Sequence, residues 1–370
     1  MGKEILLIND RLHAGGVELV LQELAAALAA RGDKITVWAA EGDRDTLRQK
    51  YPAGTRFARL PFWDKPCRRW SAKWFFCRAC RVLFEGFLLR IKKWDAVFAI
   101  KEGGCMRLTA KLRAQRKIAW VHTDYSAFHW TSCKFHSDAE ELACMRSFDT
   151  VVCVSGAVKN GLVRALGDPG NIRVLYNPLD VASVTAKAKT APADCKPPMG
   201  RPLLVSVGRL SEVKRYGMLM DICKRLGAEL DFELWIVGGG ELEESLREKQ
   251  RREGIDNVRL LGARDNPYPY VACADWFVSS SESEGYGLVV QEALVLGVPV
   301  IAARCAAVEE SLDPAFGVLT ESSPAALEAG LRHILSQPEL SGQYKAAIAR
   351  DFDPADFWQP RIDAILELTE

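Results

Sequence analysis

Residues 276–302 of the chain read WFVSSSESEGYGLVVQEALVLGVPVIA. This stretch opens on an apolar run that is typical of a buried strand and closes on a second one. Between them, a polar loop with Gly285 and Gly287 leads into an apolar segment that is interrupted only by Gln291 and Glu292. The order predicts a strand, a loop, a helix and a strand of a parallel α/β sheet. In such sheets, ligands bind at the carboxyl ends of the strands, where this loop is expected to lie.

Two glutamates of the stretch are candidate ligand contacts. Gly285 and Gly287 lie where the helix is expected to begin, so backbone N–H groups there can approach a phosphate closely. Glu292 follows one to two turns later among apolar residues, where an unpaired carboxylate is costly, and a ribose diol offers it two hydroxyl donors. Glu284 precedes it by roughly 10–15 Å of chain, about the span from a sugar through a diphosphate to a ribose. A structural alternative stays open, in which Glu284 favours the helix dipole and Glu292 forms an ion pair.

The same stretch resembles the E-x7-E signature of retaining nucleotide-sugar glycosyltransferases with the GT-B fold, family 4 (glycosyl transferases group 1). The resemblance implies an α/β chain of two Rossmann-like domains that face each other across a cleft. It implies an N-terminal acceptor-binding domain at residues 1–180 and a C-terminal nucleotide-sugar-binding domain at residues 201–353. Residues 181–200 are the linker between them, and residues 354–370 form a terminal helix that packs back on the first domain. It places Glu284 on the donor sugar, Glu292 on the ribose, and the following residues at the donor: Gly285, Tyr286, Gly287, Leu288 and Val289.

A second cluster of candidates lies near the start of the second half. Arg209 and Lys214 are two cations five residues apart, at a predicted strand end and helix start, and suit a diphosphate. A solvated turn is the alternative. In the family that the chain resembles, an arginine and a lysine at these points contact the leaving diphosphate. The resemblance also implies that the glycines after three predicted strands line the donor site: Gly208, Gly238 and Gly262.

The first half carries weaker signals. Gly15 and Gly16 lie between a predicted strand and a helix, which is typical of a phosphate-facing turn or simply of a tight turn. The pattern is not G-x-G-x-x-G, which argues against a dinucleotide-dependent oxidoreductase. His122 ends another predicted strand and faces a ligand edge or serves a structural role. The resemblance implies that Gly15 and Gly16 approach the donor phosphates and that His122 contacts the donor sugar.

The composition limits the alternatives. A chain of 370 residues can form two domains, and its net charge of +1 does not favour nucleic acid as a partner. The 11 cysteines are scattered, and no signal peptide precedes the first strand, so we expect reduced thiols in the cytoplasm. Asp43 and Asp45 resemble the D-x-D pair of metal-dependent glycosyltransferases, but Asp43 is better explained as the cap of a helix that begins near Thr46, and we expect no metal site.

Residues 62–94 differ from the rest of the chain because aromatic and basic side chains alternate there with few acids. This composition suits a peripheral contact with the inner face of the cell membrane, where rings lie at headgroup depth and cations meet anionic lipid. A core-packing helix with a basic solvent face and an RNA-binding patch are the alternatives. We adopt the membrane surface as the partner and expect no nucleic acid.

The resemblance, together with these features, implies a metal-independent, retaining glycosyltransferase without a cofactor. We expect it to move a hexose or N-acetylhexosamine from a UDP-sugar to a saccharide acceptor, lipid-linked, in envelope or capsular polysaccharide synthesis. The alternatives are a nucleotide-sugar 2-epimerase of the same fold and a non-catalytic nucleotide-sugar-binding protein.

Overall fold

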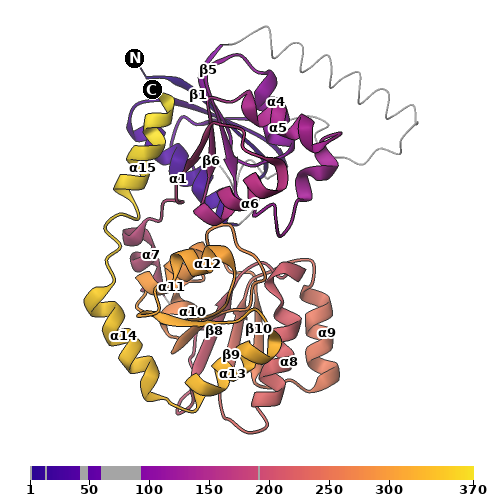
Figure 1. The fold of residues 1–370 in the computed structure, drawn as a ribbon. Helices are drawn as coiled ribbons and strands as arrows, with labels where there is room; N and C mark the ends of the chain where they lie inside the picture. The colour runs from indigo at the N-terminus through magenta and orange to yellow at the C-terminus, as the bar shows by residue number, and fades with distance from the viewer. Residues whose placement is uncertain (1, 13–14, 42–48, 60–92, 191) are drawn as a thin grey trace. The chain divides into compact units, whose positions relative to one another are not determined.

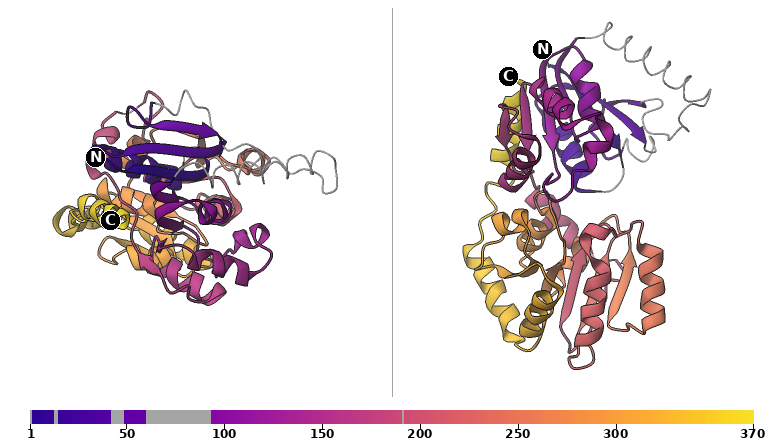
Figure 2. Two further views of the ribbon diagram at one scale, coloured as in Figure 1. Left: turned by 90° about the horizontal axis from the view of Figure 1, so that it is seen from above. Right: turned by 45° about the vertical axis from the view of Figure 1, so that its right-hand side comes forward.

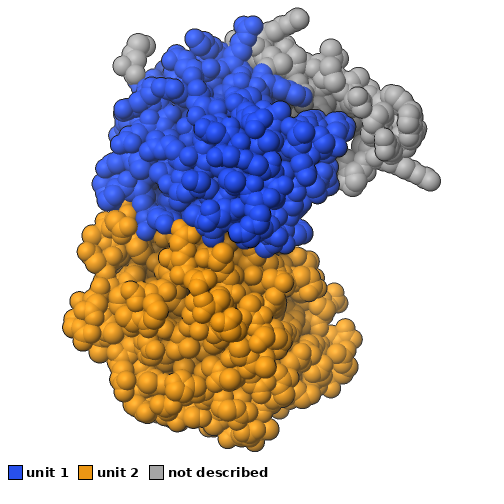
Figure 3. Space-filling model, in the orientation of Figure 1, with its two compact units in different colours: residues 1–178, 359–370 blue, residues 179–358 orange. Residues whose placement is uncertain are grey.

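The computed structural model describes residues 2–12, 15–41, 49–59, 93–190 and 192–370. The chain divides into two compact units (Figure 3). Unit 1 comprises residues 1–178 and 359–370, and unit 2 comprises residues 179–358. Each unit is built on a parallel sheet with helices packed against it (Figures 1 and 2).

The sheet of unit 1 has the strand order β3-β2-β1-β4-β5-β6-β7 among the described residues. Its strands are β1 (Glu4–Arg11), β2 (Lys34–Glu41), β3 (Arg56–Arg59), β4 (Trp94–Ala99), β5 (Ala114–Val121), β6 (Thr150–Cys153) and β7 (Ile172–Val174). The paired strands run parallel, and β1, β4 and β5 lie at the centre, where apolar side chains are fully buried. The sheet order changes direction at β1, so the loops after β1 and β4 diverge at a point where ligands bind in open α/β sheets.

Among the described residues of unit 1, helices such as α1 form because their apolar residues recur on one face. The helices of this unit are α1 (Gly16–Ala30), α4 (Gly104–Lys111), α5 (Asp138–Arg146), α6 (Gly156–Leu166) and α15 (Gln359–Leu366), with the short helices η1 (Trp130–Lys134) and η3 (Glu367–Thr369). In α1, Val20, Leu24 and Leu28 are buried at helical spacing. Ser155 caps α6 by accepting a hydrogen bond from Val158 N (3.1 Å), as its sequence position predicts.

Unit 2 contains a second parallel sheet, in the order β10-β9-β8-β11-β12-β13. Its strands are β8 (Leu203–Val207), β9 (Glu233–Val237), β10 (Val258–Gly262), β11 (Trp276–Ser279), β12 (Val300–Ala303) and β13 (Gly317–Thr320). Its helices are α7 (Val181–Ala188), η2 (Glu212–Lys214), α8 (Tyr216–Leu226), α9 (Glu243–Glu253), α10 (Tyr268–Ala272), α11 (Leu288–Val295), α12 (Ala306–Ser311), α13 (Pro324–Leu335) and α14 (Glu339–Asp351).

Alternate side chains of these strands pack in two separate hydrophobic cores, because successive side chains of a strand point to opposite faces of the sheet. Leu204 and Leu234 pack with α8, α9 and α13, whereas Val205 and Trp235 pack with α10, α11 and α12. Both faces of the sheet are therefore covered, which explains why its strands read as continuous apolar runs.

The structure also differs from the sequence-based expectations. The sequence analysis does not predict strands β3 and β13, which lie at sheet edges. Strand β3 reads RFAR and contains no apolar run, whereas β13 reads GVLT and does contain a short one. The expected linker, residues 181–200, includes helix α7, which belongs to unit 2 and contacts α10 and α11. Phe357, expected on the first domain, packs in unit 2 beside Leu179, and only residues 359–370 belong to unit 1.

Nearly all of the basic aromatic region, residues 62–94, lies outside the described residues, and so does the Asp43–Asp45 pair. Within the part of the chain that the structure describes, no helix has the length and apolarity to cross a bilayer. The described part likewise shows no group of three or more His, Cys, Asp or Glu residues arranged to hold a metal ion.

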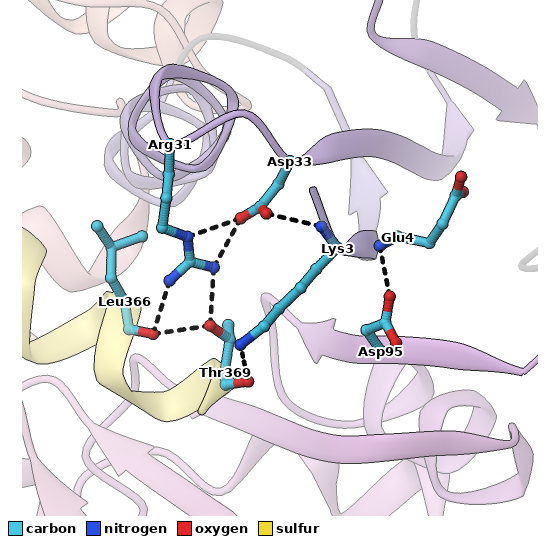
Figure 4. A network of polar contacts seen from close by, with 7 residues as sticks. All are labelled: Lys3, Glu4, Arg31, Asp33, Asp95, Leu366 and Thr369. Atoms are coloured by element: carbon cyan, nitrogen blue, oxygen red, sulfur yellow. Dashed lines mark hydrogen bonds and ion pairs between the residues drawn. The ribbon is translucent and has the colours of Figure 1, made fainter. Parts of the chain in front are cut away.

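The C-terminal residues are held on unit 1 by a polar network (Figure 4). The guanidinium of Arg31 donates to Asp33 Oδ2 (2.6 Å), to Thr369 Oγ1 (2.8 Å) and to the carbonyl of Leu366 (3.2 Å). Lys3 Nζ donates to the carbonyl of Thr369 (2.8 Å). The side chain of Arg31 is 27% exposed and that of Asp33 only 4%, so this pair is shielded more than an ordinary surface pair.

Arg31→Ala should therefore lower the free energy of unfolding of unit 1 by about 1–3 kcal/mol, because Asp33 loses its charged partner and two C-terminal hydrogen bonds are lost. Thermal melting and amide hydrogen exchange of residues 359–370 measure the effect. Arg350→Ala is the control, since Arg350 pairs with Asp351 at a 71%-exposed surface position. Equal melting temperatures and equal exchange in the two variants would show that the network does not anchor these residues.

Candidate functional site

Three glycines converge at the carboxyl edge of the unit 2 sheet. Gly208 N donates to the carbonyl of Val237 (3.0 Å), and Gly238 N donates to the carbonyl of Gly262 (2.9 Å). A Cβ atom on Gly238 would lie 1.9 Å from the carbonyl oxygen of Gly208, so only glycine permits this approach. The structure thus brings together Gly208, Gly238 and Gly262, which follow or end three neighbouring strands.

Lys214 lies beside this glycine cluster. A Cβ atom on Gly208 would be 3.5 Å from Lys214 Cε, so the lysine stem passes close to the bare backbone. Lys214 Nζ forms an ion pair with Glu284 Oε1 at 2.5 Å, and both side chains are largely buried, 17% and 12% exposed. Lys214 comes from the loop after β8 and Glu284 from the loop after β11, and these two strands are neighbours in the sheet.

Further hydrogen bonds lock these two loops together. Ser280 Oγ donates to the carbonyl of Lys214 (2.6 Å), and Glu282 N donates to the carbonyl of Val213 (2.8 Å). Arg215 adopts the left-handed conformation (φ 53°) and pairs with Glu282 at 2.6 Å. A non-glycine residue in this conformation is held there by its surroundings. The position of Lys214 is therefore set by the backbone of both loops.

Arg209 is placed differently from Lys214. Its side chain is 67% exposed and its Nε lies 3.2 Å from Glu241 Oε2, a residue that is itself 53% exposed. An exposed pair of this kind is weak and readily exchanged for another partner. Arg209 is thus an exposed cation at the same edge at which Lys214 is a largely buried one.

Helix α11 begins at this edge as the sequence predicts. Gly287 is its N-cap residue and takes the left-handed conformation (φ 77°), which favours glycine. Tyr286 is buried, and Leu288 and Val289 form the first turn of the helix. The backbone N–H groups of this turn lie at the positive end of the helix dipole.

Glu292 lies in the second turn of α11 and has one partner that sequence reasoning missed. Tyr268 Oη donates to Glu292 Oε1 at 3.0 Å. Burial raises the pKa of the Glu292 carboxyl to about 7, an effect that the Tyr268 hydrogen bond and Lys187 only partly oppose. The Asn266-Pro267 pair before Tyr268 signals a turn and a helix start, but nothing in the sequence connects Tyr268 to a carboxylate 24 residues later.

In unit 1, His122 follows the central strand β5. Its ring Nε2 lies 2.9 Å from the carbonyl oxygen of Ile100, and its backbone N donates to Glu102 Oε2 (3.2 Å). A carbonyl can only accept, so Nε2 carries the hydrogen. Burial lowers the pKa of His122, Lys101 lowers it further, and the Glu102 charge opposes both. The imidazole is therefore neutral near pH 7.

Glu102 is the second residue that sequence reasoning missed. It is 1% exposed, and its Oε1 accepts from Thr123 Oγ1 (2.6 Å) and Trp130 Nε1 (3.0 Å). It follows β4 at the carboxyl edge of the sheet, so the rule that selected His122 would also have selected it. Gly15 and Gly16, in the same unit, form the N-cap and first residue of α1, and Gly15 has an extended backbone.

The loop after β5 carries aromatic residues that are candidates for the border of an acceptor site. The structure shows that these residues differ in their exposure to solvent. Tyr125 is buried, Phe128 is 61% exposed, and Trp130 is held by Glu102. His129 donates from Nε2 to Glu141 Oε2 at 2.9 Å. Glu141 also accepts from Tyr125 Oη (2.9 Å), so this buried carboxylate ties the far side of the loop.

Comparison with known proteins identifies the family. A model described as Glycosyltransferase Family 4 matches residues 14–183, and one described as Glycosyl transferases group 1 matches residues 201–337. The chain belongs to glycosyltransferase family 4, group 1. The family assignment made from the glutamate-containing stretch is confirmed.

Curated relatives of this family 4 chain include the lipopolysaccharide core biosynthesis glycosyltransferase LpsE of Rhizobium meliloti. It is 31% identical over 164 residues, which cover 44% of this chain and 46% of LpsE. The N-acetylgalactosamine-N,N'-diacetylbacillosaminyl-diphospho-undecaprenol 4-alpha-N-acetylgalactosaminyltransferase of Campylobacter jejuni is 30% identical over 181 residues, 48% of each chain. The match therefore spans about half the length of either relative.

Among solved structures, Anabaena Alr3699/HepE in complex with UDP superposes on this family 4 chain with a TM-score of 0.73. The two chains are 19% identical, and the match covers 99% of each. At this identity the likeness establishes the fold, and the predicted GT-B class of α/β protein is confirmed.

Glu292→Gln should change the stability of this family 4 chain in a pH-dependent way. Because the folded-state pKa is about 7 and that of an unfolded glutamate about 4.3, the wild-type protein loses stability as pH rises between these values. Glutamine has no such charge, so the variant should be more stable at pH 8, by at most about 4 kcal/mol, and close to wild type at pH 4.5. Melting temperatures across this range measure the difference.

Glu244→Gln, at an exposed position of α9, is the control. Its melting temperature relative to wild type should show no trend with pH. A difference between Glu292→Gln and wild type that stays constant from pH 4.5 to 8 would contradict the raised pKa.

Proposed function

We propose that the protein transfers a hexose or N-acetylhexosamine from a UDP-sugar to a saccharide acceptor, with retention of anomeric configuration and without a metal ion. The observation that carries this proposal is the Lys214–Glu284 pair, which holds a lysine against bare glycine backbone next to the start of α11. This arrangement suits a pyrophosphate, because a fixed cation and backbone N–H groups stabilise anionic charge.

The reaction requires charge stabilisation at one end of the donor. The bond between the anomeric carbon and the diphosphate oxygen breaks, and negative charge develops on the diphosphate. In the proposal, Lys214 and Arg209 stabilise that charge together with the first turn of α11. The acceptor hydroxyl attacks the anomeric carbon from the same face and passes its proton to the departing phosphate, so that no enzymic nucleophile is needed.

The remaining residues of unit 2 divide the donor between them. When a diphosphate neutralises Lys214, Glu284 is released to accept hydrogen bonds from sugar hydroxyls. Glu292 accepts from the ribose hydroxyls and Tyr268 orients it. Gly208, Gly238, Gly262 and Gly285 allow the donor to approach the backbone, with Tyr286, Leu288 and Val289 around it.

Residues of unit 1 complete the proposed assignment. His122 contacts the donor sugar, and Gly15 and Gly16 face its phosphates. Uracil as the base of the donor is supported by HepE, which was solved with UDP and with UDP-glucose. A mycobacterial relative, 29% identical over 52% of this chain, is named as GDP-mannose-dependent, so guanine is the competing base.

A lipid-linked acceptor is the final part of the proposal. The names of the two curated relatives refer to a lipopolysaccharide core and to a diphospho-undecaprenol. The basic aromatic composition of residues 62–94 supports a peripheral position at the inner face of the cell membrane. The release of UDP from UDP-sugars and of GDP from GDP-sugars, measured with and without vesicles that contain a polyprenyl-diphosphate saccharide, tests donor and acceptor together.

The outcomes of this assay separate the competing functions. Nucleotide release that depends on acceptor supports the transferase. Conversion of the donor sugar to its 2-epimer without acceptor would indicate an epimerase. UDP binding without release from any donor would indicate a binding protein, and either result would overturn the proposal.

The double variant Arg209→Ala, Lys214→Ala should reduce turnover by a factor of at least about 100, because the leaving diphosphate loses both cations. The control is Lys224→Ala, Arg225→Ala, which removes the same two residue types from surface ion pairs at the end of α8. Initial rates at saturating donor give the comparison. A fully active Arg209–Lys214 double variant would refute the charge argument.

Glu292→Ala should weaken UDP binding by about 10- to 100-fold and leave turnover at saturating donor within a few-fold of wild type. Loss of the ribose acceptor affects the bound ground state and the transition state alike, which raises KM alone. Isothermal titration with UDP measures the affinity, and uridine diphosphate compared with 2′-deoxyuridine diphosphate tests the ribose contact. An unchanged UDP affinity would remove Glu292 from the donor site.

A further inference from the structure

We propose that Glu102 is a positioning residue for His122, which it holds by the backbone so that ring atom Nδ1 is presented to the substrate. This inference rests on the proposed function, in which His122 contacts the donor sugar. It concerns a residue that does not itself reach the substrate, because Glu102 is 1% exposed.

Glu102 collects three donors from the segment that follows β5. Its Oε2 accepts from His122 N at 3.2 Å, and its Oε1 accepts from Thr123 Oγ1 at 2.6 Å and from Trp130 Nε1 at 3.0 Å. Lys101, which precedes it, stands 5.1 Å from the centroid of a Trp130 ring and pairs with Asp10 at 2.8 Å. One buried carboxylate thus fixes the backbone of the histidine and the loop beyond it.

The ring itself is held by Ile100, two residues before Glu102. The Ile100 carbonyl accepts from Nε2, so Nδ1 carries the lone pair, and no hydrogen bond joins Nδ1 to any described residue. A neutral imidazole in this tautomer accepts a hydrogen bond from a hydroxyl group at Nδ1. Sugar hydroxyls are donors of this kind, so the tautomer suits the role proposed for His122.

Three donors require a carboxylate at this point. Glutamine has one acceptor oxygen, so its NH₂ group would face either the His122 N–H or the pair formed by Thr123 and Trp130. Two donors would then oppose each other in a buried place, and the backbone of His122 would shift. Glu102→Gln therefore changes hydrogen bonding at almost constant volume.

Glu141 provides a matched control in the same unit. It is 0% exposed, and it accepts from two side chains of the same loop, Tyr125 and His129, at 2.9 Å each. Neither a hydrogen bond nor an ion pair joins Glu141 to His122 in the described part of the chain. Glu141→Gln therefore removes the same charge from an equally buried site and perturbs the same loop at its other side.

The first experiment is spectroscopic and needs no activity. The chain has five histidines, so ¹⁵N imidazole spectra are resolvable, and the His122→Asn variant assigns the His122 signals. Wild-type protein should show His122 as the Nε2–H tautomer from pH 7 to 8. Glu102→Gln should shift these signals or mix the tautomers, whereas Glu141→Gln should leave them in place. Lys101 and Glu102 are the charged groups that act on this ring, and both variants retain Lys101.

The second experiment separates turnover from binding. Glu102→Gln should lower kcat by about 10- to 100-fold with the donor KM within threefold, because a misplaced contact costs rate more than affinity. Glu141→Gln should keep kcat within threefold of wild type. Adding Glu102→Gln to a His122→Ala protein should cause no further loss, since the two residues act as one unit.

The outcomes are distinguishable from failure of the proposed function. A wild-type protein without transfer activity refutes that function, and the spectra still decide whether Glu102 orients His122. Unchanged His122 signals and unchanged kcat in folded Glu102→Gln protein overturn the inference. If that variant does not fold, Trp130→Phe removes one donor to Glu102 and keeps the ring, and unchanged His122 signals in it overturn the inference equally.

Discussion

The ion pair between Lys214 and Glu284 is the interaction on which the unit 2 site depends. It joins the loops that follow two adjacent central strands, β8 and β11, and it is largely shielded from water. Shielding strengthens the attraction between the charges but makes either of them costly alone. The pair therefore keeps a cation in place before any ligand arrives. A site arranged in this way does not need to reorganise when charge develops on a substrate.

Unit 1 follows the same design with different chemistry. Polar residues also follow its central strands β4 and β5. There, however, a buried carboxylate accepts hydrogen bonds from neutral donors instead of pairing with a cation. Glu102 and the carbonyl of Ile100 hold His122 from two sides, which sets both its backbone and its tautomer. In both units, a residue that could contact a ligand is fixed by a second residue from the neighbouring strand. The common cause is the parallel sheet, which brings the ends of adjacent strands to one edge.

Sequence reasoning located the strand ends but not the partners that hold them. Long buried strands and helix starts such as Gly287 carry local signals, so the fold and candidates such as Lys214 and Glu284 could be predicted. The bond from Tyr268 to Glu292 joins residues on different helices, and it depends on packing that no local pattern encodes. Edge strand β3 was missed because its residues, RFAR, form no apolar run. Edge strand β13, GVLT, has only Val318 and Leu319 as a strand signal after a glycine, which is too short to separate a strand from a loop. Glu102 was missed for a different reason. Polar residues that follow the carboxyl end of a central strand are ligand candidates, and this criterion selected His122 after β5 although it applies equally to Glu102 after β4.

The return of residues 359–370 to unit 1 has a consequence for synthesis on the ribosome. Domains usually fold in the order in which they emerge, the N-terminal one first. Here Arg31 and Lys3 bind Leu366 and Thr369, which emerge after the whole of unit 2. While unit 2 is being synthesised, the surface of α1 that later contacts α15 therefore stays uncovered. Unit 2, in contrast, is complete before residues 359–370 have been made. The speed of translation across unit 2 would therefore set how long Arg31 and Lys3 lack their C-terminal partners.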